Sequence, residues 1–562
     1  MIRHRLAQVL RIAAVPCLVA TATAFVARVP DPKQGAGLPL EMAQSSLFAG
    51  SGNCEFCHTS DGEVLRDKEG NDLSPPQDWR STMMANSFTD PYFQATLERE
   101  VALRPGRKAE IEDSCLTCHA PMARTQAIHD GATSFSLAQA EVSPLARDGV
   151  SCTLCHQIQP DNLGTPESWN GGYEITDERV IFGPYATEDI YQFAMQSALN
   201  YTPQYGAHKT QSEVCATCHT LFTPIVDDLG TILGQFPEQT PYLEWKNSVF
   251  SQPASIQSCQ DCHMPITTDP VVISSFPPGV EHTPFYKHYF VGGNAFMLSL
   301  LKNNIDGLGL TASEEQFDRT IERTLDQLRT RTVNVSVAEL DADDGKARVA
   351  VRLENLAGHK FPTGYPARRA WLKFVARDAG GNVLFESGAW NPDGEIVGLS
   401  DPFEPHHDLI ANPADVQVYE PIIADLGGAV TTSLMGAASY LKDNRLPPRG
   451  YLSTGSHAAS TAIIGDAATD PNFNRDAAVE GTGADVVTYE FDISAADGAV
   501  TVEATLVYQS VAPRFVAPFR DTAMPKAVSF LAMYDAEENA PATVGHVSHL
   551  LGAPGDASWM IF

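Results

Sequence analysis

Basic residues are scarce in this sequence. Its 562 residues include 38 lysines and arginines against 69 aspartates and glutamates, which gives a formal net charge of −31. A surface this acidic repels nucleic acids and anionic membranes, so we expect neither as a partner. Two interpretations of the charge remain: solubility, as in a saline habitat, or steering of a basic protein partner.

Long hydrophobic runs are absent except for one at the N-terminus. Residues 12–26 form an apolar run of roughly 15 residues, whereas a membrane span needs about 20. Three arginines precede the run, and small residues with Ala-x-Ala spacing end it. This pattern predicts a secretory signal peptide over residues 1–27. An uncleaved membrane anchor is the alternative, and in either case we expect a periplasmic or extracellular protein.

Apart from Cys17, cysteine occurs only in one repeated motif. Of 11 cysteines, Cys17 lies in the predicted signal peptide and the other ten occur in five CxxCH motifs. The motifs are Cys54, Cys57 and His58; Cys115, Cys118 and His119; Cys152, Cys155 and His156; Cys215, Cys218 and His219; and Cys259, Cys262 and His263.

Three familiar uses of paired cysteines fail to explain the histidine in these motifs. Disulfide bridging does not require it, zinc ribbons place histidines elsewhere, and a thioredoxin-like dithiol would occur once rather than five times. Attachment of c-type haem explains all three residues, because two thiols form thioethers and the histidine becomes an axial ligand of the iron. The sequence therefore predicts five c-type haems.

The chain divides into segments that differ in their motifs and in their predicted secondary structure. All five motifs lie within residues 45–300, which predicts a loop-rich, mainly helical pentahaem cytochrome c domain. With roughly 40 residues per haem, we expect the porphyrins to replace a separate apolar core. In the linking segment 301–330, a capping box at Ser313 and Gln316 predicts an amphipathic helix that runs to about Arg329.

Short alternating segments fill residues 331–562. VNVSVAEL, ARVAVRLEN, AWLKFVAR, NVLFESG, DVVTYEFDI and TVEATLVYQ are rich in Val, Phe and Tyr, and several are separated by turn residues. They predict strands of an antiparallel β-sandwich. The predicted fold class is therefore α+β, with a helical multihaem module followed by a β-sandwich-like domain.

Several segments resemble a known family. DWRSTMMANSFTDPYF, CLTCHAPMA, DGVSCTLCH and CATCHTLF are similar to multihaem cytochromes c of the tetrahaem electron-carrier type found in ammonia oxidisers. GHKFPTGYPARRAWL, VQVYEPIIADLGG and YLKDNRLPPRGY resemble the C-terminal β-domain that accompanies such modules in bacterial multihaem cytochromes. The resemblance implies electron transfer through closely stacked haems, usually with histidine at both axial positions.

Five further histidines are candidates for the second axial position. The resemblance implies His208, upstream of the fourth motif, and His288, before a Gly-Gly turn. His359 lies in a loop stiffened by two prolines, so we expect it to be held at a fixed angle and to cap one iron from the β-domain. His282 and His129 are the remaining candidates.

Two further predictions concern neighbouring residues in the β-domain. Arg368 and Arg369 follow the His359 loop, and guanidinium groups suit pairing with haem propionates. His406 and His407 are adjacent, so in an extended segment they point to opposite faces and cannot both serve one iron.

The predicted function is electron transfer between redox partner proteins outside the cytoplasm. The alternative is an oxidoreductase that acts on a small nitrogen or sulfur compound at a haem with an open axial position. The CxxCK motif that commonly marks the active haem of pentahaem nitrite reductases is absent, which weakens this alternative. A third hypothesis is a subunit of a larger electron-transfer assembly in which the β-domain is the docking module.

Overall fold

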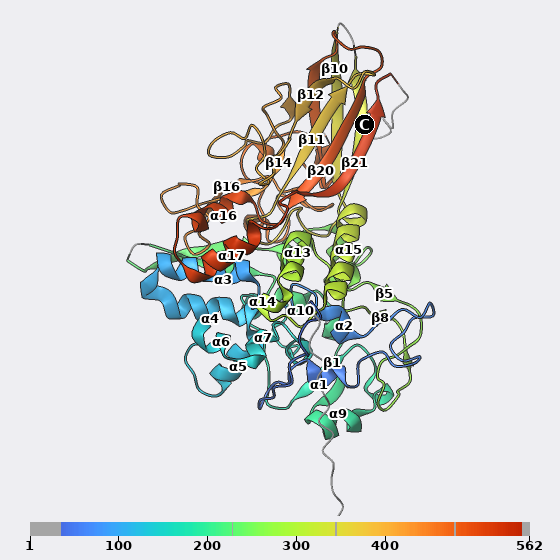
Figure 1. Ribbon diagram of the computed structural model, residues 1–562, viewed down its shortest axis with the longest axis vertical. Helices are drawn as coiled ribbons and strands as arrows, with labels where there is room; N and C mark the ends of the chain where they lie inside the picture. The colour runs from blue at the N-terminus through green and yellow to red at the C-terminus, as the bar shows by residue number, and fades with distance from the viewer. Residues whose placement is uncertain (1–34, 228, 343–344, 477–478, 553–562) are drawn as a thin grey trace, which may run out of the picture.

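The computed structural model describes residues 35–227, 229–342, 345–476 and 479–552, so the predicted signal peptide lies outside the described residues. Short helices and loops from the N-terminal half form one end of the molecule, and strands from the C-terminal half form the other (Figure 1). The arrangement confirms the predicted α+β fold class. None of the described helices is long and apolar enough to cross a membrane.

The N-terminal region consists of short elements joined by loops. Its helices are α1 (Gly52–Glu55), α2 (Pro75–Trp79), α3 (Pro91–Leu103), α4 (Lys108–His119), α5 (Pro121–His129), α6 (Leu137–Glu141), α7 (Pro144–Arg147), α8 (Cys152–Cys155), α9 (Gln192–Leu199), α10 (Glu213–Ala216), α11 (Pro241–Lys246) and α12 (Cys259–His263). Its paired strands are β1 (Val180–Gly183) with β2 (Thr202–Tyr205), β3 (Leu221–Val226) with β4 (Ile232–Gln239), β5 (Ile266–Thr267) with β8 (Phe285–Tyr286), and β6 (Val271–Val272) with β7 (Glu281–His282).

This region has an apolar core of its own, which the sequence analysis did not predict. Leu116 and Leu154, which lie between the cysteines of the second and third motifs, are buried there with Met122 and Ala146. Because the cysteines and the histidine of a motif share one face of a helical turn, an intervening residue can point the other way into this cluster. The expectation that haems would replace a separate core is therefore wrong for helices α4 to α8.

The linking segment is helical, as predicted. Its helices are α14 (Ile305–Leu308) and α15 (Glu314–Arg331), and α13 (Ala295–Asn303) begins before residue 301 and extends into the segment. The capping box is confirmed, because the Ser313 hydroxyl accepts from the Gln316 N–H and the Gln316 side chain accepts from the Ser313 N–H at 2.9 Å. Helix α15 ends at Arg331, and the first strand of the C-terminal region begins at Val333.

The C-terminal region is built from two main sheets. One has the order β13 (Leu409–Ile410), β19 (Ala484–Asp492), β10 (Lys346–Asn355) and β9 (Val333–Asp341). The other has the order β12 (Val383–Ser387), β11 (Arg369–Arg377), β20 (Thr501–Gln509) and β21 (Ala542–Leu550), with β14 (Val418–Tyr419) also paired to β11. Two-stranded ribbons are formed by β15 (Pro421–Ala424) with β16 (Ser439–Asp443) and by β17 (Arg475–Asp476) with β18 (Val479–Glu480).

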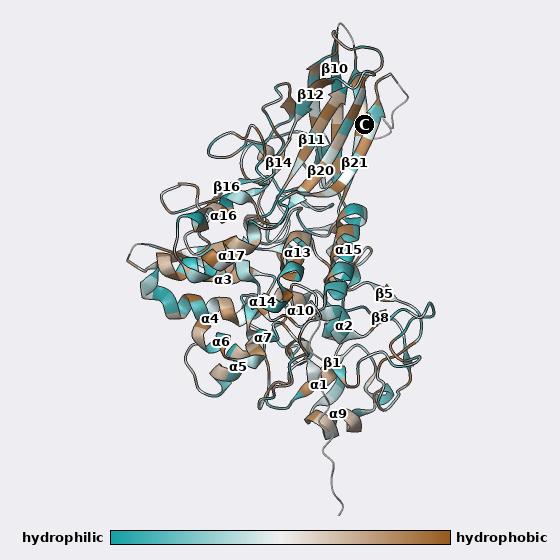
Figure 2. Ribbon diagram, in the orientation of Figure 1, coloured by the Kyte–Doolittle hydropathy of each residue, from teal (hydrophilic) through white to brown (hydrophobic). Residues whose placement is uncertain are grey.

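The two sheets share one apolar core. Hydrophobic and hydrophilic residues alternate along the strands (Figure 2), and the inward-facing ones meet between the sheets. Phe374 of β11 stacks on Tyr489 of β19 with ring centroids 4.0 Å apart. The main pairings are antiparallel, as predicted, but the two-residue strand β13 runs parallel to β19.

Two C-terminal helices, absent from the sequence analysis, join the two regions. They are α16 (Pro513–Arg520) and α17 (Pro525–Tyr534), and α17 packs against α3 of the N-terminal region. Tyr92 of α3 contacts Phe519 and Phe530 at ring-centroid distances of 6.2 and 5.2 Å. The Glu98 carboxylate of α3 accepts from the Lys526 N–H at 2.8 Å, at the beginning of α17.

Candidate functional site: a cavity shared by five CxxCH motifs

All five CxxCH motifs border one cavity of about 1640 Å³. Sites for single small molecules have volumes of roughly 300–1,000 Å³, so this cavity is large enough for several bound groups. Every motif contributes both cysteines and its histidine to the wall. The wall residues from the motifs are Cys54, Cys57, His58, Cys115, Cys118, His119, Cys152, Cys155, His156, Cys215, Cys218, His219, Cys259, Cys262 and His263.

Each motif forms a helical turn. The His58 N–H donates to the Cys54 carbonyl at 3.0 Å, and the same bond in the third motif joins His156 to Cys152 at 3.0 Å. The second motif forms the C-terminal end of α4, and the fifth motif forms α12. Residues i, i+3 and i+4 share one face of a helix, so two thiols and one imidazole project to the same side. This geometry lets one planar group contact all three.

The motif thiols are free. None of the ten cysteines in the described part of the chain is in a disulfide. Burial raises the pKa of Cys115 to about 12 and that of Cys155 to about 11, which keeps these thiols neutral. The unpaired thiols of the motifs are available for covalent attachment to haem.

Four of the motif histidines have the same ring orientation. The Nδ1 atoms of His58, His119 and His156 bond to backbone carbonyls at 2.9, 3.0 and 2.7 Å, respectively. The Nδ1 atom of His263 bonds in the same way to the Val291 carbonyl. A carbonyl at Nδ1 places the proton there and leaves Nε2 free, which is the arrangement of metal-ligating histidines. These residues therefore fit an iron in the cavity.

Two of the predicted distal histidines face motif histidines across the cavity. The ring centroids of His156 and His288 are 6.2 Å apart with planes at 17°, and those of His263 and His359 are 6.1 Å apart with planes at 15°. Two imidazoles that share one metal through bonds of about 2 Å have centroids about 6 Å apart. The Nδ1 atoms of both distal candidates bond to carbonyls, of Tyr286 at 3.0 Å and of Lys360 at 2.8 Å.

The other three candidates have different environments. His282 borders the cavity, and its ring stacks on Tyr185 at 4.2 Å. His208 is buried outside the cavity wall, and its Nε2 bonds to the Ile158 carbonyl at 3.0 Å, which leaves only Nδ1 for a metal. His129 is far more exposed and contacts Asp130 and Asp177, away from the cavity. Among the described residues, none of the hydrogen bonds or ion pairs of His129 involves a motif histidine.

Thiols of different motifs meet inside the cavity. Three pairs of thiols from different motifs lie close enough to interact: Cys54 with Cys152, Cys118 with Cys218, and Cys215 with Cys259. Cys155 of the third motif is within electrostatic reach of Cys218 of the fourth. The spatial order therefore runs from the first motif to the third and then to the fourth, which neighbours both the second and the fifth.

Apart from Arg368, which the sequence analysis predicted, several wall residues have no signal in the sequence. The cationic side chains on the wall fit the propionates of haem; they are Arg124, Lys209, Arg331 and Arg368. Arg369 points to the opposite side of its strand and donates to Gln509 at 2.8 Å, so the predicted propionate pairing of Arg369 is wrong. Phe93 stacks on His119 at 3.7 Å. Only the folded chain brings these residues together.

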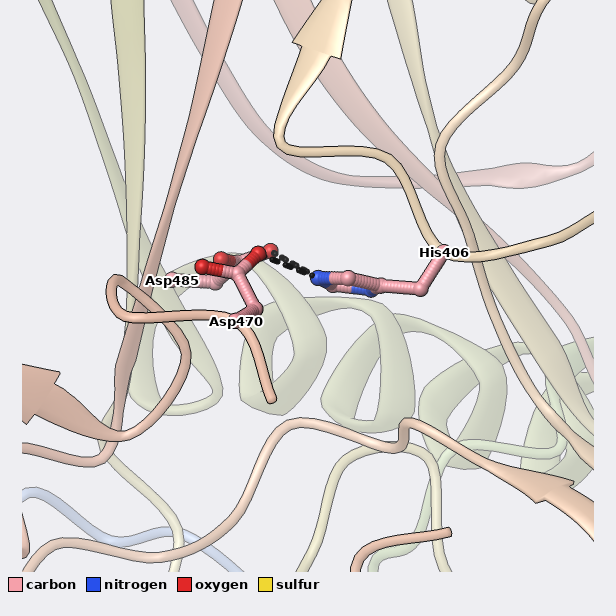
Figure 3. Close-up of side chains that lie close together, drawn as sticks. All are labelled: His406, Asp470 and Asp485. Atoms are coloured by element: carbon pink, nitrogen blue, oxygen red, sulfur yellow. Dashed lines mark hydrogen bonds and ion pairs between the residues drawn. The ribbon is translucent and has the colours of Figure 1, made fainter. Parts of the chain in front are cut away.

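His406 lies apart from the cavity in a buried cluster with Asp470 and Asp485 (Figure 3). Its Nε2 is 2.9 Å from an Asp470 oxygen, and its Nδ1 faces the side-chain amides of Gln417 and Asn444 at 2.7 and 3.0 Å. Both amide oxygens accept from backbone N–H groups, so both amide nitrogens must donate to Nδ1. Nε2 therefore carries the proton and donates to Asp470, and the cluster is a closed hydrogen-bond network rather than a metal site.

Comparison with known proteins supports a multihaem cytochrome c. Residues 53–157, which contain the first three motifs, match the family described as cytochrome c554 and c-prime. The fold is similar to that of a penta-heme cytochrome c552 from Thermochromatium tepidum, with 19% identity and a TM-score of 0.52 over 90% of this chain and 100% of that chain. No curated protein matches the chain. The match and the geometry support binding of c-type haem and a role in electron transport.

Proposed function

We propose that this chain is a pentahaem cytochrome c that relays electrons outside the cytoplasm between redox partner proteins. The observation that carries the proposal is the convergence of five CxxCH triplets on one cavity, where thiols of different motifs lie close together. Each c-type haem supplies an iron that gains and loses one electron. The chain would attach these groups through ten thiols and orient them through the imidazoles that line the cavity.

The axial ligands follow from the ring geometry. His156 with His288, and His263 with His359, are the pairs whose separation suits one iron each. The carbonyls at their Nδ1 atoms hold the rings in place and raise their basicity as ligands. His359 belongs to the C-terminal region, so this pair would join the two regions of the molecule through a metal.

The count of five haems is tested by the intact mass of the mature protein. We expect the polypeptide to be heavier by five haems, and we expect acid–acetone to extract none of them because each is held by thioethers. Cys118→Ser removes one thioether and should leave a less stable chain, since the haem also fills the cavity. Fewer than five haems in the parent protein, or haem that is extracted, would contradict the proposal.

A second candidate function is catalysis at one iron. Beyond the motif histidines, only three histidines of the described chain border the cavity: His282, His288 and His359. With His208 added, four histidines are available for five irons, so at least one sixth position has no histidine. An open position is what an enzyme acting on a small nitrogen or sulfur compound requires.

Electron paramagnetic resonance of the oxidised protein tests this second function. We expect one high-spin haem in the parent protein if a position is open, and turnover with nitrite or hydroxylamine if that position is catalytic. Five low-spin haems would remove the structural basis for catalysis. A high-spin haem without turnover would leave the protein an electron carrier.

A further inference from the structure

We propose that Glu244 is a positioning residue which, together with Lys360, Asp443 and Arg445, holds the His359 ring opposite His263. The inference rests on the proposed ligation by His359 and names the side chains that set its geometry. Glu244 lies on α11, between the fourth and fifth motifs, whereas the other three residues belong to the C-terminal region. The network thus crosses the boundary between the two regions.

Four buried charges form this network. The Lys360 ammonium bonds to Asp443 at 2.7 Å, Arg445 bonds to both oxygens of Asp443 at 2.8 and 2.7 Å, and an Arg445 nitrogen is 3.3 Å from Glu244. All four side chains are buried, with exposed fractions of 0 to 3%. Two anions and two cations cancel, so the network is neutral only while it is complete. Loss of one member leaves an uncompensated charge with no access to water.

Glu244 also bonds directly to the loop that carries His359. One carboxylate oxygen accepts from the Lys360 N–H at 3.0 Å and from the Thr363 hydroxyl at 2.5 Å. The His359 carbonyl accepts from the Asn355 side chain at 2.8 Å. The peptide unit between His359 and Lys360 is therefore held on both sides.

The same residue that Glu244 anchors also orients the imidazole. The Lys360 carbonyl accepts from Nδ1 of His359 at 2.8 Å, so a rotation of Lys360 turns the ring. Lys360 donates three hydrogen bonds. Its backbone N–H donates to Glu244, and its ammonium donates to Asp443 and, at 2.9 Å, to the Ala462 carbonyl. A ligand held in this way is preorganised, because little conformational entropy remains to be lost when it binds.

Glu244→Ala in the full haem-loaded protein tests the role. We expect one additional high-spin haem relative to the parent in electron paramagnetic resonance, and we expect added imidazole to restore the parent spectrum. Glu244→Gln keeps an oxygen for the Lys360 N–H and should retain the spin states of the parent, although it removes one charge from the network and should lower stability. A folded Glu244→Ala protein with the parent spectrum would overturn the inference.

Two controls separate the possible causes. Glu420 is also buried and pairs with Lys442 and Arg514, but these contacts do not reach the loop that carries His359, so Glu420→Ala should reduce stability without changing the spin states. His359→Ala should convert one haem to high spin. If the spectrum of His359→Ala also equals that of the parent, His359 is not an axial ligand. If the spectrum changes in His359→Ala but not in Glu244→Ala, His359 is a ligand but Glu244 does not position it.

If the Glu244→Ala protein does not fold, a variant with a smaller effect tests the same inference. Thr363→Val removes one hydrogen bond to Glu244 and preserves the shape of the side chain. We expect cyanide to replace His359 at a concentration about two- to tenfold lower than in the parent, which is the effect of one hydrogen bond. Unchanged cyanide binding in Thr363→Val would overturn the inference.

Discussion

At His359 and His406, the same side chain is hydrogen-bonded in opposite ways. A carbonyl faces Nδ1 of His359 and leaves Nε2 free toward His263, whereas two amide donors face Nδ1 of His406 and place its proton on Nε2. The His359 side chain is half-buried on the cavity wall, whereas His406 is buried and Asp470 lies beside it. Burial and acidic neighbours therefore do not identify a histidine as a metal ligand. The group hydrogen-bonded to Nδ1 does, because it decides whether Nε2 is free to bind a metal.

Asp485, in the His406 cluster, should titrate far above an ordinary aspartate. Burial raises its pKa to about 6, although His406 and the Tyr419 hydroxyl, 2.6 Å away, favour the charged form. Because the folded pKa exceeds the unfolded value of about 3.9, the protonated carboxyl stabilises the fold below pH ~4. This contribution is lost as the pH rises through about 6.

Infrared titration of the protonated-carboxyl band measures the pKa of Asp485. Asp485→Asn should remove one component that titrates near pH 6 in the parent protein. Asp492→Asn is the matched control, since Asp492 ends the same strand, is exposed and has a lowered pKa. Identical titration curves for the parent and Asp485→Asn would show that this carboxyl is ionised at lower pH.

At the scale of elements, regular local patterns were predictable and irregular ones were not. The capping box predicted α15, and alternation predicted six strands, from β9 to β20, within about one residue of their ends. The sequence did not predict helix α16, because Pro518 interrupts its helical pattern. Strand β21 has little apolar alternation because it lies at the edge of its sheet.

Which residues of the site meet one another was predictable only for residues that are neighbours in sequence. Each CxxCH motif is one helical turn, so spacing alone reveals which side chains meet. By contrast, His156 and His288 are 132 residues apart, and Glu244 and Lys360 are 116 residues apart. No local pattern connects them, because packing of whole elements brings them together. The assignments of distal ligands stay predictions until the spectra of variants are measured.

For the whole molecule, charge should govern the encounter with partners. A net charge of −31 creates a long-range field that attracts cations and repels anions. Salt screens this field, since the Debye length falls from about 30 Å at 0.01 M to about 8 Å at 0.15 M ionic strength. The electron-exchange rate with a partner should therefore depend on salt with a sign set by the partner's own charge.

Stopped-flow measurements with two small redox proteins, one basic and one acidic, test this prediction. Between about 0.01 and 0.15 M ionic strength, we expect the second-order rate constant with the basic protein to fall by about tenfold or more, because steering enhances association by roughly 10- to 1,000-fold. With the acidic protein, the rate constant should rise over the same range, since salt weakens the repulsion. If both partners show the same salt dependence, the acidic surface serves solubility and does not select the partner.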